Sequence, residues 1–337
     1  MPGHPADLWE RDGERVRCLL CPHACRIAEG NVGVCGVRRN EGGALVALTY
    51  GRVSSIAVDP IEKKPVFHYF PGSTALSLGS VGCTMKCGHC QNWQISRAHV
   101  EDGGLKDVEP AAAVQLAEKY GCRGLAFTYN EPVIWAEYVR DCGELAHEAG
   151  LYSVMVTNGY ITREGLDYLA PAIDVWRVDV KGMTDEAVRT LCKVQHAATV
   201  LEMAERAKRF HHLHVEVVTN VVPGINDDEG QLRSLARWIA EALGPGTPWH
   251  ITRFFPYLDF AHVPATPLET LRRAREIGRE EGLHFVYLGN VAEPGGEDTV
   301  CTSCGAAAVR REGYTVIEQR TRDGACVRCG TPLGVVG

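Results

Sequence analysis

Eleven of the fourteen cysteines in this 337-residue chain fall into three short groups, which constrains the fold more than any other feature. The groups are Cys18, Cys21, Cys25 and Cys35; Cys83, Cys87 and Cys90; and Cys301, Cys304, Cys326 and Cys329. Spaced cysteines in a chain of the reducing cytosol indicate metal or redox chemistry rather than disulfides. The remaining three, Cys122, Cys142 and Cys192, are expected to be small buried apolar residues.

Composition sets the class of protein. Hydrophobic residues make up 45% and charged residues 23%, which excludes a disordered or fibrous chain. The charge of 35 − 42 = −7 does not provide the broad basic field that non-specific nucleic-acid binding requires. The sequence shows no apolar signal-peptide core and no run near the ~20 apolar residues of a membrane span. We expect a cytoplasmic protein with no nucleic-acid or membrane partner.

Strand-like and helix-like segments alternate between about residues 74 and 290. Seven apolar runs predict strands, at residues 74–81, 123–129, 151–158, 172–180, 213–222, 249–255 and 284–290. Between them, helices are predicted at residues 109–120, 132–149, 162–169, 197–210, 227–243 and 267–281. This alternation predicts an α/β fold built from βαβ units on a parallel sheet. Six or seven units favour a partial or near-complete β/α barrel, with a doubly wound sheet as the alternative.

Three segments follow from the cysteine groups and the alternation. Residues 1–70 are expected to form a cysteine-rich N-terminal segment with short strands. Residues 71–295 are expected to form the barrel. Residues 296–337 are expected to form a four-cysteine ribbon module of the zinc-ribbon or rubredoxin type.

The middle group has the spacing C-x3-C-x2-C and directly follows the first predicted strand of the barrel. Loops at the carboxyl ends of barrel strands are where active sites of such folds are built. Three thiolates do not complete a tetrahedral structural zinc site, but they can hold three irons of a 4Fe–4S cluster and leave the fourth open. A zinc site completed by His89 or by a distant residue is the alternative.

This triplet resembles the signature of radical S-adenosylmethionine (radical SAM) enzymes. The following residues, CQNWQIS at 90–96, resemble the branch that contains pyruvate formate-lyase activases. The chain most resembles the AmmeMemoRadiSam system radical SAM enzyme group, through residues 18–40, 127–132, 156–160, 178–182, 221–228, 249–256 and 287–291. It departs from the activases at residues 256–258, which read Pro-Tyr-Leu where those enzymes carry Pro-aromatic-His.

The resemblance implies a reaction. S-adenosylmethionine would chelate the open iron, and an electron from the reduced cluster would cleave its sulfonium C–S bond. The 5′-deoxyadenosyl radical so formed would abstract hydrogen from a small molecule or a partner protein, which makes the chain a radical SAM oxidoreductase or transferase. Reduced flavodoxin or ferredoxin would supply the electron, and Memo-like and Ammecr-type proteins would be partners.

Matching residue to residue, the resemblance also implies a binding site for S-adenosylmethionine at successive strand ends. Its residues are Asn130 and Glu131 after the second strand, Thr157 and Asn158 after the third, and Asp179 and Lys181 after the fourth. Carboxylates can accept hydrogen bonds from an amino group or from ribose hydroxyls, and lysine can donate to a carboxylate.

The C-terminal group consists of two C-x2-C knuckles, each followed by glycine, a pattern typical of a tetrahedral site of four thiolates. Zinc is favoured there over a rubredoxin-like iron, with a stabilising role. The N-terminal group also offers four thiolates, for which structural zinc, an auxiliary iron–sulfur cluster or a substrate clamp are the alternatives.

Two polar residues on the sixth predicted strand, His250 and Arg253, are candidates for contact with substrate. Because side chains alternate along a strand, the two lie on opposite faces, and only one of them points inward unless a bulge intervenes. Arg253 is favoured, as a partner for an anionic group, with a structural ion pair as the alternative.

Two further hypotheses about function remain. The chain could be a glycyl-radical-enzyme activase like the pyruvate formate-lyase activating enzyme. It could also be a non-catalytic zinc-binding interaction protein, which the acidity, the barrel pattern and the middle cysteine loop oppose.

Overall fold

The structure, a computed structural model, describes residues 3–337, and the chain divides into two compact units. The first unit comprises the residues up to 59, residues 74–176 and residues 198–213, and the second comprises residues 60–73, 177–197 and 214–337. Among the described residues, no helix combines the length and the apolar character that crossing a membrane requires.

Short antiparallel strands open the first unit, in agreement with the irregular, strand-bearing segment predicted there. They are β1 (His4–Pro5), β2 (Trp9–Asp12), β3 (Arg15–Cys18), β4 (Arg26–Ile27), β5 (Arg38–Glu41), β6 (Ala44–Ala47) and β7 (Arg52–Val53), the last paired with β10 (Lys106–Asp107). Strands β2, β3 and β4 form one small sheet, and β1, β6 and β5 form another. The N-terminal cysteines lie in and around the first of these sheets.

An α/β layer follows in the same unit. Its strands are β8 (Ser55–Pro60), β9 (Thr74–Gly79), β11 (Gly124–Phe127) and β12 (Tyr152–Thr157), hydrogen-bonded in that order. Strands β9, β11 and β12 are parallel, and almost all of their residues are buried, as expected where both faces of a sheet are covered. The helices are α1 (Trp93–Ser96), α2 (Pro110–Lys119), α3 (Ala136–Glu148), α4 (Arg163–Leu169) and α6 (Ala198–Arg209).

The second unit continues the βα alternation. Its strands run in the order β13 (Val175–Asp179, in this unit from Arg177 on), β14 (His214–Val221), β15 (Trp249–Arg253) and β16 (Val286–Gly289), where β14, β15 and β16 are parallel. Its helices are α5 (Asp185–Cys192), α7 (Glu229–Trp238) and α8 (Leu268–Glu280). All seven apolar runs that predicted strands are therefore strands, and the α/β class is confirmed.

Two helices differ from the sequence prediction. Helix α5 was not predicted, although the hydroxyl of Thr184 caps it by accepting a hydrogen bond from the backbone N–H of Ala187 at 3.1 Å. Helix α7 begins two residues later than predicted, because Asp228 is its N-cap and accepts from the backbone N–H of Gln231 at 2.9 Å. The last predicted residues of that helix, Ile239–Leu243, form a π-helical turn.

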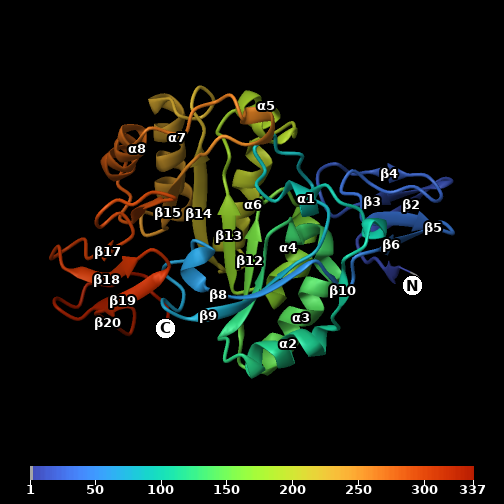
Figure 1. Cartoon of the computed structure of the whole chain (residues 1–337), viewed down its shortest axis with the longest axis horizontal. Coiled ribbons are helices and arrows are strands. Elements are labelled where there is room, and N and C mark those ends of the chain that lie inside the picture. The colour runs from blue at the N-terminus through green and yellow to red at the C-terminus, as the bar shows by residue number, and fades with distance from the viewer. Residues whose placement is uncertain (1–2) are drawn as a thin grey trace. The chain divides into compact units, whose positions relative to one another are not determined.

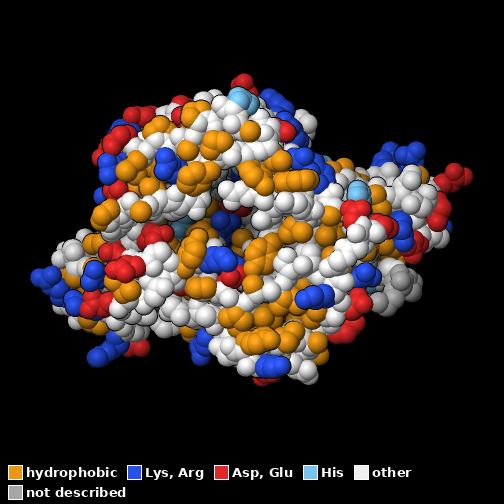
Figure 2. All heavy atoms as spheres, in the orientation of Figure 1, with side chains coloured by type: hydrophobic (Ala, Val, Ile, Leu, Met, Phe, Trp, Pro, Cys, Tyr) orange, Lys and Arg blue, Asp and Glu red, His pale blue; other side chains and the backbone are white. Residues whose placement is uncertain are grey.

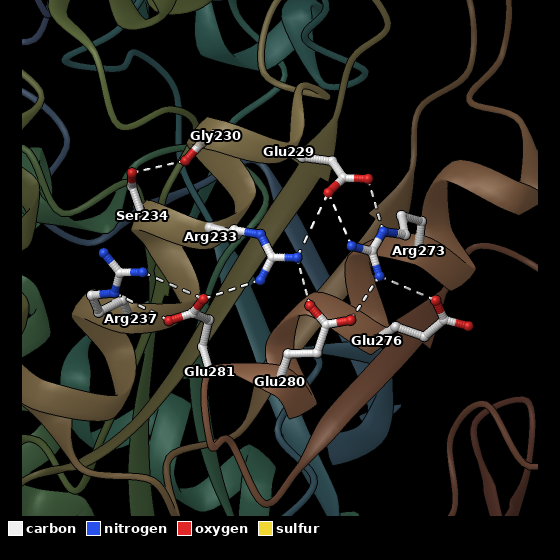
Figure 3. Close-up of polar contacts among 9 residues, drawn as sticks. All are labelled: Glu229, Gly230, Arg233, Ser234, Arg237, Arg273, Glu276, Glu280 and Glu281. Atoms are coloured by element: carbon white, nitrogen blue, oxygen red, sulfur yellow. Dashed lines mark hydrogen bonds and ion pairs between the residues drawn. The ribbon is translucent and has the colours of Figure 1, made fainter.

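Helices α7 and α8 lie side by side (Figure 1) and are joined by a network of ion pairs (Figure 3). Glu229 and Glu280 each pair with both Arg233 and Arg273, and Glu281 pairs with Arg233 and Arg237. These groups are partly or fully exposed, so salt screens their attraction. Figure 2 shows Lys and Arg interspersed with Asp and Glu on the face that it draws.

The C-terminal residues of the second unit form a ribbon, drawn in red in Figure 1. Strands β17 (Thr299–Val300), β18 (Ala307–Glu312) and β19 (Thr315–Gln319) make one antiparallel sheet, and β20 (Thr321–Arg322) pairs with β21 (Ala325–Cys326). Cys301 and Cys326 pack in one buried cluster with Phe67, Phe285 and Tyr287. The ribbon therefore shares a core with the strand β16 region of its unit.

Candidate active site

The three middle cysteines lie in the loop between β9 and α1. Strand β9 ends at Gly79, where a Cβ atom would stand 2.9 Å from the ring of Tyr129, so this close approach requires glycine. The backbone N–H of Met85 donates to the sulfur of Cys83 at 3.4 Å, and the sulfur of Cys90 lies 3.4 Å from the hydroxyl of Ser96. A guanidinium nitrogen of Arg97 donates to the carbonyl of Cys87 at 3.1 Å. The loop is thus held from both of its ends.

The spacing of the sulfurs distinguishes a cluster from a single ion. Zinc–sulfur bonds are about 2.3 Å long, so two sulfurs on one zinc ion lie at most about 4.6 Å apart. Within residues 3–337, the C-terminal cysteines are the one set of three or more metal-ligating side chains whose ligand atoms all lie within 4.8 Å of one another. The middle cysteines, with or without His89, are not gathered for one ion, and three thiols without a fourth fit a 4Fe–4S cluster with one open iron.

Asn130 fastens the chain just before the first cysteine. Its side-chain oxygen accepts from the backbone N–H of Ser80 at 3.0 Å, and its side-chain nitrogen donates to the carbonyl of Gly82 at 3.0 Å. Asn130, in the loop after β11, therefore fixes the backbone that leads from β9 to Cys83.

Glu131 joins the ends of β11 and β12 and is only 2% exposed. Its carboxylate accepts from the backbone N–H of Val133 at 3.0 Å, from the hydroxyl of Thr157 at 2.6 Å and from the backbone N–H of Asn158 at 2.7 Å. With three donors, this carboxylate is well satisfied inside the protein. The structure thus brings together Glu131, Thr157 and Asn158, while Asn130, next to Glu131 in the chain, bonds to the backbone before Cys83.

Asn158 extends this network to the cysteine loop. Its side-chain nitrogen donates to the hydroxyl of Thr84 at 3.0 Å and lies 3.7 Å from the sulfur of Cys83. Burial raises the pKa of the Cys83 thiol well above its ordinary value, and the negative charge of Glu131 adds to that shift. A cationic iron at this position would favour the thiolate that the protein alone disfavours.

The fourth predicted pair, Asp179 and Lys181, lies in the second unit at the end of β13. Lys181 contacts Asp179 at 3.4 Å, and Arg177 pairs with the other carboxylate oxygen at 2.9 Å. Burial would raise the pKa of Asp179, but the charges of Arg177 and Lys181 outweigh it and hold the pKa below its ordinary value. Asp179 is therefore a carboxylate held between two cations.

The two candidate substrate residues on β15 are both engaged within their unit. His250 is 2% exposed, and its Nε2 lies 2.6 Å from the buried carboxylate of Glu216. Arg253 donates from Nε to the carbonyl of Thr266 at 2.8 Å and lies over the ring of Phe255. Of the two, Arg253 is the less buried and has further donors beyond this bond.

The C-terminal cysteines form a compact metal-ligand set. The sulfurs of Cys301 and Cys329 lie 3.5 Å apart, and those of Cys304 and Cys326 lie 3.8 Å apart. Hydrogen bonds from Thr331 lower the pKa of the Cys329 thiol to about 6, which favours the ligating thiolate. Four sulfurs at these distances fit one tetrahedral metal ion, either zinc or iron.

The N-terminal cysteines line one cavity together with Arg38. In the same segment, Nε2 of His23 lies 2.7 Å from the carbonyl of Thr84, so this segment contacts the middle cysteine loop. Cys122, Cys142 and Cys192 are buried, as expected.

Two residues that contact predicted site residues, Arg177 and Thr84, were not identified from the sequence. Arg177 precedes Asp179 by two positions on β13, so strand alternation, which places both side chains on one face, could have identified it. Thr84 carried no comparable pattern, because its role depends on contacts with His23 and Asn158 that only the folded chain creates.

Comparisons with known proteins agree with this geometry. The radical SAM superfamily matches residues 78–236, which include the middle cysteines. An uncharacterized protein of Methanocaldococcus jannaschii is 39% identical over 327 residues, covering 96% of this chain and 97% of that protein. The pyruvate formate-lyase 1-activating enzyme of Escherichia coli is 28% identical over 167 residues, covering 47% of this chain and 65% of that enzyme. The chain thus matches slightly less than two thirds of the activating enzyme.

Among solved structures, a radical SAM methyltransferase from Sphaerobacter thermophilus shares the fold, with a TM-score of 0.50 and 15% identity. The match covers 65% of this chain and 67% of the methyltransferase. Residues 78–236, which hold the loop of three cysteines, thus belong to the radical SAM superfamily, whose enzymes use a 4Fe–4S cluster and S-adenosylmethionine.

Proposed function

We propose that Cys83, Cys87 and Cys90 hold a 4Fe–4S cluster and that the chain uses it to cleave S-adenosylmethionine reductively. When bound and reduced, the cluster supplies the one electron that breaks the sulfonium C–S bond, yielding methionine and a 5′-deoxyadenosyl radical that abstracts hydrogen from the substrate. The remaining work of orientation and exclusion of water falls to the protein.

The observation that carries this proposal is the network joining the cysteine loop to the ends of two parallel strands. Asn130 fixes the backbone before Cys83, while Asn158 reaches the Cys83 sulfur and is itself held by Glu131. Such a network fixes the loop in one position, which chemistry at an open iron requires.

The proposed roles of the predicted binding residues follow from their partners. Because the Glu131 carboxylate and the Asn130 amide are already bonded inside the protein, we assign them as positioning residues. The side chains of Thr157 and Asn158 are bonded in the same way, to Glu131 and to Thr84, so we assign them too as positioning residues, beside the proposed S-adenosylmethionine site at the end of β12. In the second unit, Asp179 would accept from ribose hydroxyls, and Lys181 would donate to the methionine carboxylate.

We propose that the parallel strands complete a partial or near-complete radical SAM β/α barrel over residues 71–295. Residues 1–70 and 296–337 would be its cysteine-rich attachments, the latter a zinc-ribbon or rubredoxin-like module holding zinc or iron.

We further propose that the chain is a member of the AmmeMemoRadiSam group, with Memo-like and Ammecr-type proteins as partners. Reduced flavodoxin or ferredoxin is the proposed donor, as is general for activase-type relatives.

The substrate is proposed to be a small molecule or a partner protein, with Arg253 as the candidate contact and His250 held in the core by Glu216.

A second candidate function, activation of a glycyl radical enzyme, is favoured by the similarity to the activating enzyme of Escherichia coli. A backbone glycyl radical detected by electron paramagnetic resonance (EPR) on a candidate partner would establish that function. Membership of an enzyme family removes the third hypothesis, that of a non-catalytic zinc-binding protein.

The test is product analysis under anaerobic conditions. The chain is reconstituted with iron and sulfide, reduced with dithionite and given S-adenosylmethionine. We expect 5′-deoxyadenosine from the wild type and none from Cys87→Ala, with Cys122→Ala as a control that retains the cleavage. Methylthioadenosine in place of 5′-deoxyadenosine would instead show cleavage toward an aminocarboxypropyl radical and contradict the proposed reaction.

A further inference from the structure

The four N-terminal cysteines surround a cavity that the proposed reaction does not use. It is lined by all four cysteines, by apolar side chains and by Arg38, and part of it is open to solvent. The four thiols thus line one space together with a buried guanidinium group.

The sulfur spacing in this cavity differs from that in the C-terminal ribbon. No three of these four sulfurs lie within 4.8 Å of one another, whereas the four sulfurs of the ribbon all do. Sulfurs that share one zinc ion must lie within about 4.6 Å. A cluster of several irons instead takes each thiolate at a different iron, and therefore needs the wider spacing.

Arg38 provides an independent observation. It is 1% exposed, and two of its nitrogens donate to the carboxylate of Glu137 at 2.8 and 2.9 Å. Its third nitrogen, Nε, is buried and has no hydrogen-bond partner among residues 3–337. A buried N–H donor left without a partner carries an energetic cost, and the sulfur atoms of an iron–sulfur cluster accept such bonds.

Backbone N–H groups also point at the cysteine sulfurs. The N–H of Val34 donates to the sulfur of Cys25 at 3.4 Å, and the N–H groups of His23 and Val37 donate to Cys21 and Cys35. The same arrangement holds Cys83 in the middle loop, where the donor is Met85. Such bonds to sulfur are among the means by which proteins tune iron–sulfur clusters.

The cavity adjoins the middle cysteine loop within the same unit. A Cβ atom on Gly82 would stand 2.5 Å from the carbonyl oxygen of Cys35, so the two backbones are in direct contact just before Cys83. Ile134 lines the cavity and packs against Val81 of the loop. The N-terminal site therefore lies next to the site of the radical chemistry.

We propose that Cys18, Cys21, Cys25 and Cys35 bind a second 4Fe–4S cluster, with Arg38 donating to one of its sulfurs. Four thiolates occupy all four irons, so this cluster has no open iron to bind S-adenosylmethionine or substrate. The chain then carries two clusters of different kinds side by side, one open and one fully ligated, in addition to the single ion of the ribbon.

The test counts metals in a chain that lacks the middle cluster. In full-length protein with Cys83, Cys87 and Cys90 all changed to alanine, anaerobic reconstitution should leave about four irons and four sulfides per chain at the N-terminal site. The wild type should hold about eight in 4Fe–4S form. The matched variant, Cys21→Ala with Cys25→Ala, should lose about four irons yet still produce 5′-deoxyadenosine from S-adenosylmethionine.

The readout of the triple variant does not depend on turnover, so it separates this proposal from the proposed reaction. It also remains informative if the double variant fails to fold. Absence of sulfide-bound iron from a folded triple variant would overturn the second cluster. A second zinc per chain in place of that iron would equally overturn it, because it would show a mononuclear site.

Discussion

The carboxylate of Glu131 is buried and accepts three hydrogen bonds, two of them from Thr157 and Asn158. In Glu131→Gln, one oxygen becomes an NH2 group that cannot accept, so at least one charged hydrogen bond is lost. Such bonds contribute about 1.5–3 kcal/mol, and we expect the rate of S-adenosylmethionine cleavage to fall by about tenfold or more.

The control for this substitution is Glu118→Gln, on an exposed position of α2. It makes the same chemical change away from the network and should retain the wild-type rate. A Glu131→Gln protein as active as the control would contradict the positioning role.

Gly82 tests how closely the two cysteine loops pack. Its φ is +87°, and a Cβ atom would meet the carbonyl oxygen of Cys35 at 2.5 Å. Gly103, with a φ of +82°, has nothing within 4 Å of a Cβ atom. Gly103→Ala should cost only the backbone penalty of about 1–3 kcal/mol, whereas Gly82→Ala should cost more and should retain less iron.

Chemical denaturation and iron analysis of the two glycine variants give this comparison. Because φ is nearly the same at the two positions, the excess loss in free energy of unfolding for Gly82→Ala reports the crowding between residue 82 and Cys35. Equal free energies and equal iron content would show that the loops do not need this contact.

At the scale of elements, we expect the metal site of the C-terminal ribbon to stabilise the protein without taking part in the cleavage of S-adenosylmethionine. Cys304 is one of four sulfurs that fit a single ion, and Cys301 and Cys326 belong to a buried cluster. Cys304→Ala should lose one metal ion per chain and lower the melting temperature, while folded protein should still cleave S-adenosylmethionine.

Metal analysis, thermal unfolding and product assay on the same sample check this expectation, with Cys122→Ala as the control cysteine. A Cys304→Ala protein that remains folded but loses all cleavage would show that the ribbon takes part in the reaction, for example by carrying electrons.

The strands were predicted from sequence because each of them is a run of mostly apolar residues. The seven buried strands read as continuous apolar runs, as strands of a parallel sheet do. Helix α5 was missed although Thr184 and two acidic residues after it form a start signal like that of the shorter helix α4, which was predicted. The start of α7 was misplaced because Asn226, Asp227 and Asp228 all suit an N-cap, and the sequence does not show which of them accepts from the backbone N–H of Gln231.

The candidate site was predicted less completely than the strands. Spacing identified the cysteines, and the strand ends identified the polar residues near them. The mutual bonding of Glu131 with Thr157 and Asn158 could not be predicted, because it joins residues more than twenty positions apart through tertiary contact. For the same reason the sequence offered His250 as a substrate contact, whereas the structure bonds it to Glu216.

At the scale of the whole molecule, buried histidines make stability depend on pH. Burial lowers the pKa of His68 to about 3, and burial also lowers the pKa of His250. The imidazole of His68 therefore stays neutral in the folded chain down to about pH 3, whereas in the unfolded chain both imidazoles take up protons below about pH 6.5. The contribution of His68 to the free energy of unfolding is therefore complete above that pH and is lost as the pH falls toward 3. The contribution of His250 is lost in the same direction.

The carboxylate of Glu216 acts in the same direction at lower pH. Burial would raise its pKa, but hydrogen bonds from His214 and His250 outweigh it and hold the pKa well below the ordinary value. Its contribution to stability is present above the unfolded pKa of about 4.3 and is lost as the pH falls through the folded pKa.

Denaturation at pH 7.5, 6.0 and 5.0 measures this dependence. Each buried neutral histidine should contribute a loss of about 1.4 kcal/mol per pH unit below about pH 6.5. His68→Asn should reduce the slope by one such share, whereas His262→Asn, at an exposed position, should leave it unchanged. Equal slopes in the wild type and His68→Asn would contradict the burial of a neutral imidazole.

The most direct test of the proposed reaction centre is EPR of the dithionite-reduced protein before and after addition of S-adenosylmethionine. We expect a reduced-cluster signal that changes shape on addition, because the open iron of the Cys83, Cys87 and Cys90 site binds the ligand. In Cys87→Ala this ligand-dependent change should be absent. A wild-type signal that S-adenosylmethionine leaves unaltered, or a protein that reconstitutes with zinc and no iron, would contradict an open cluster in this loop.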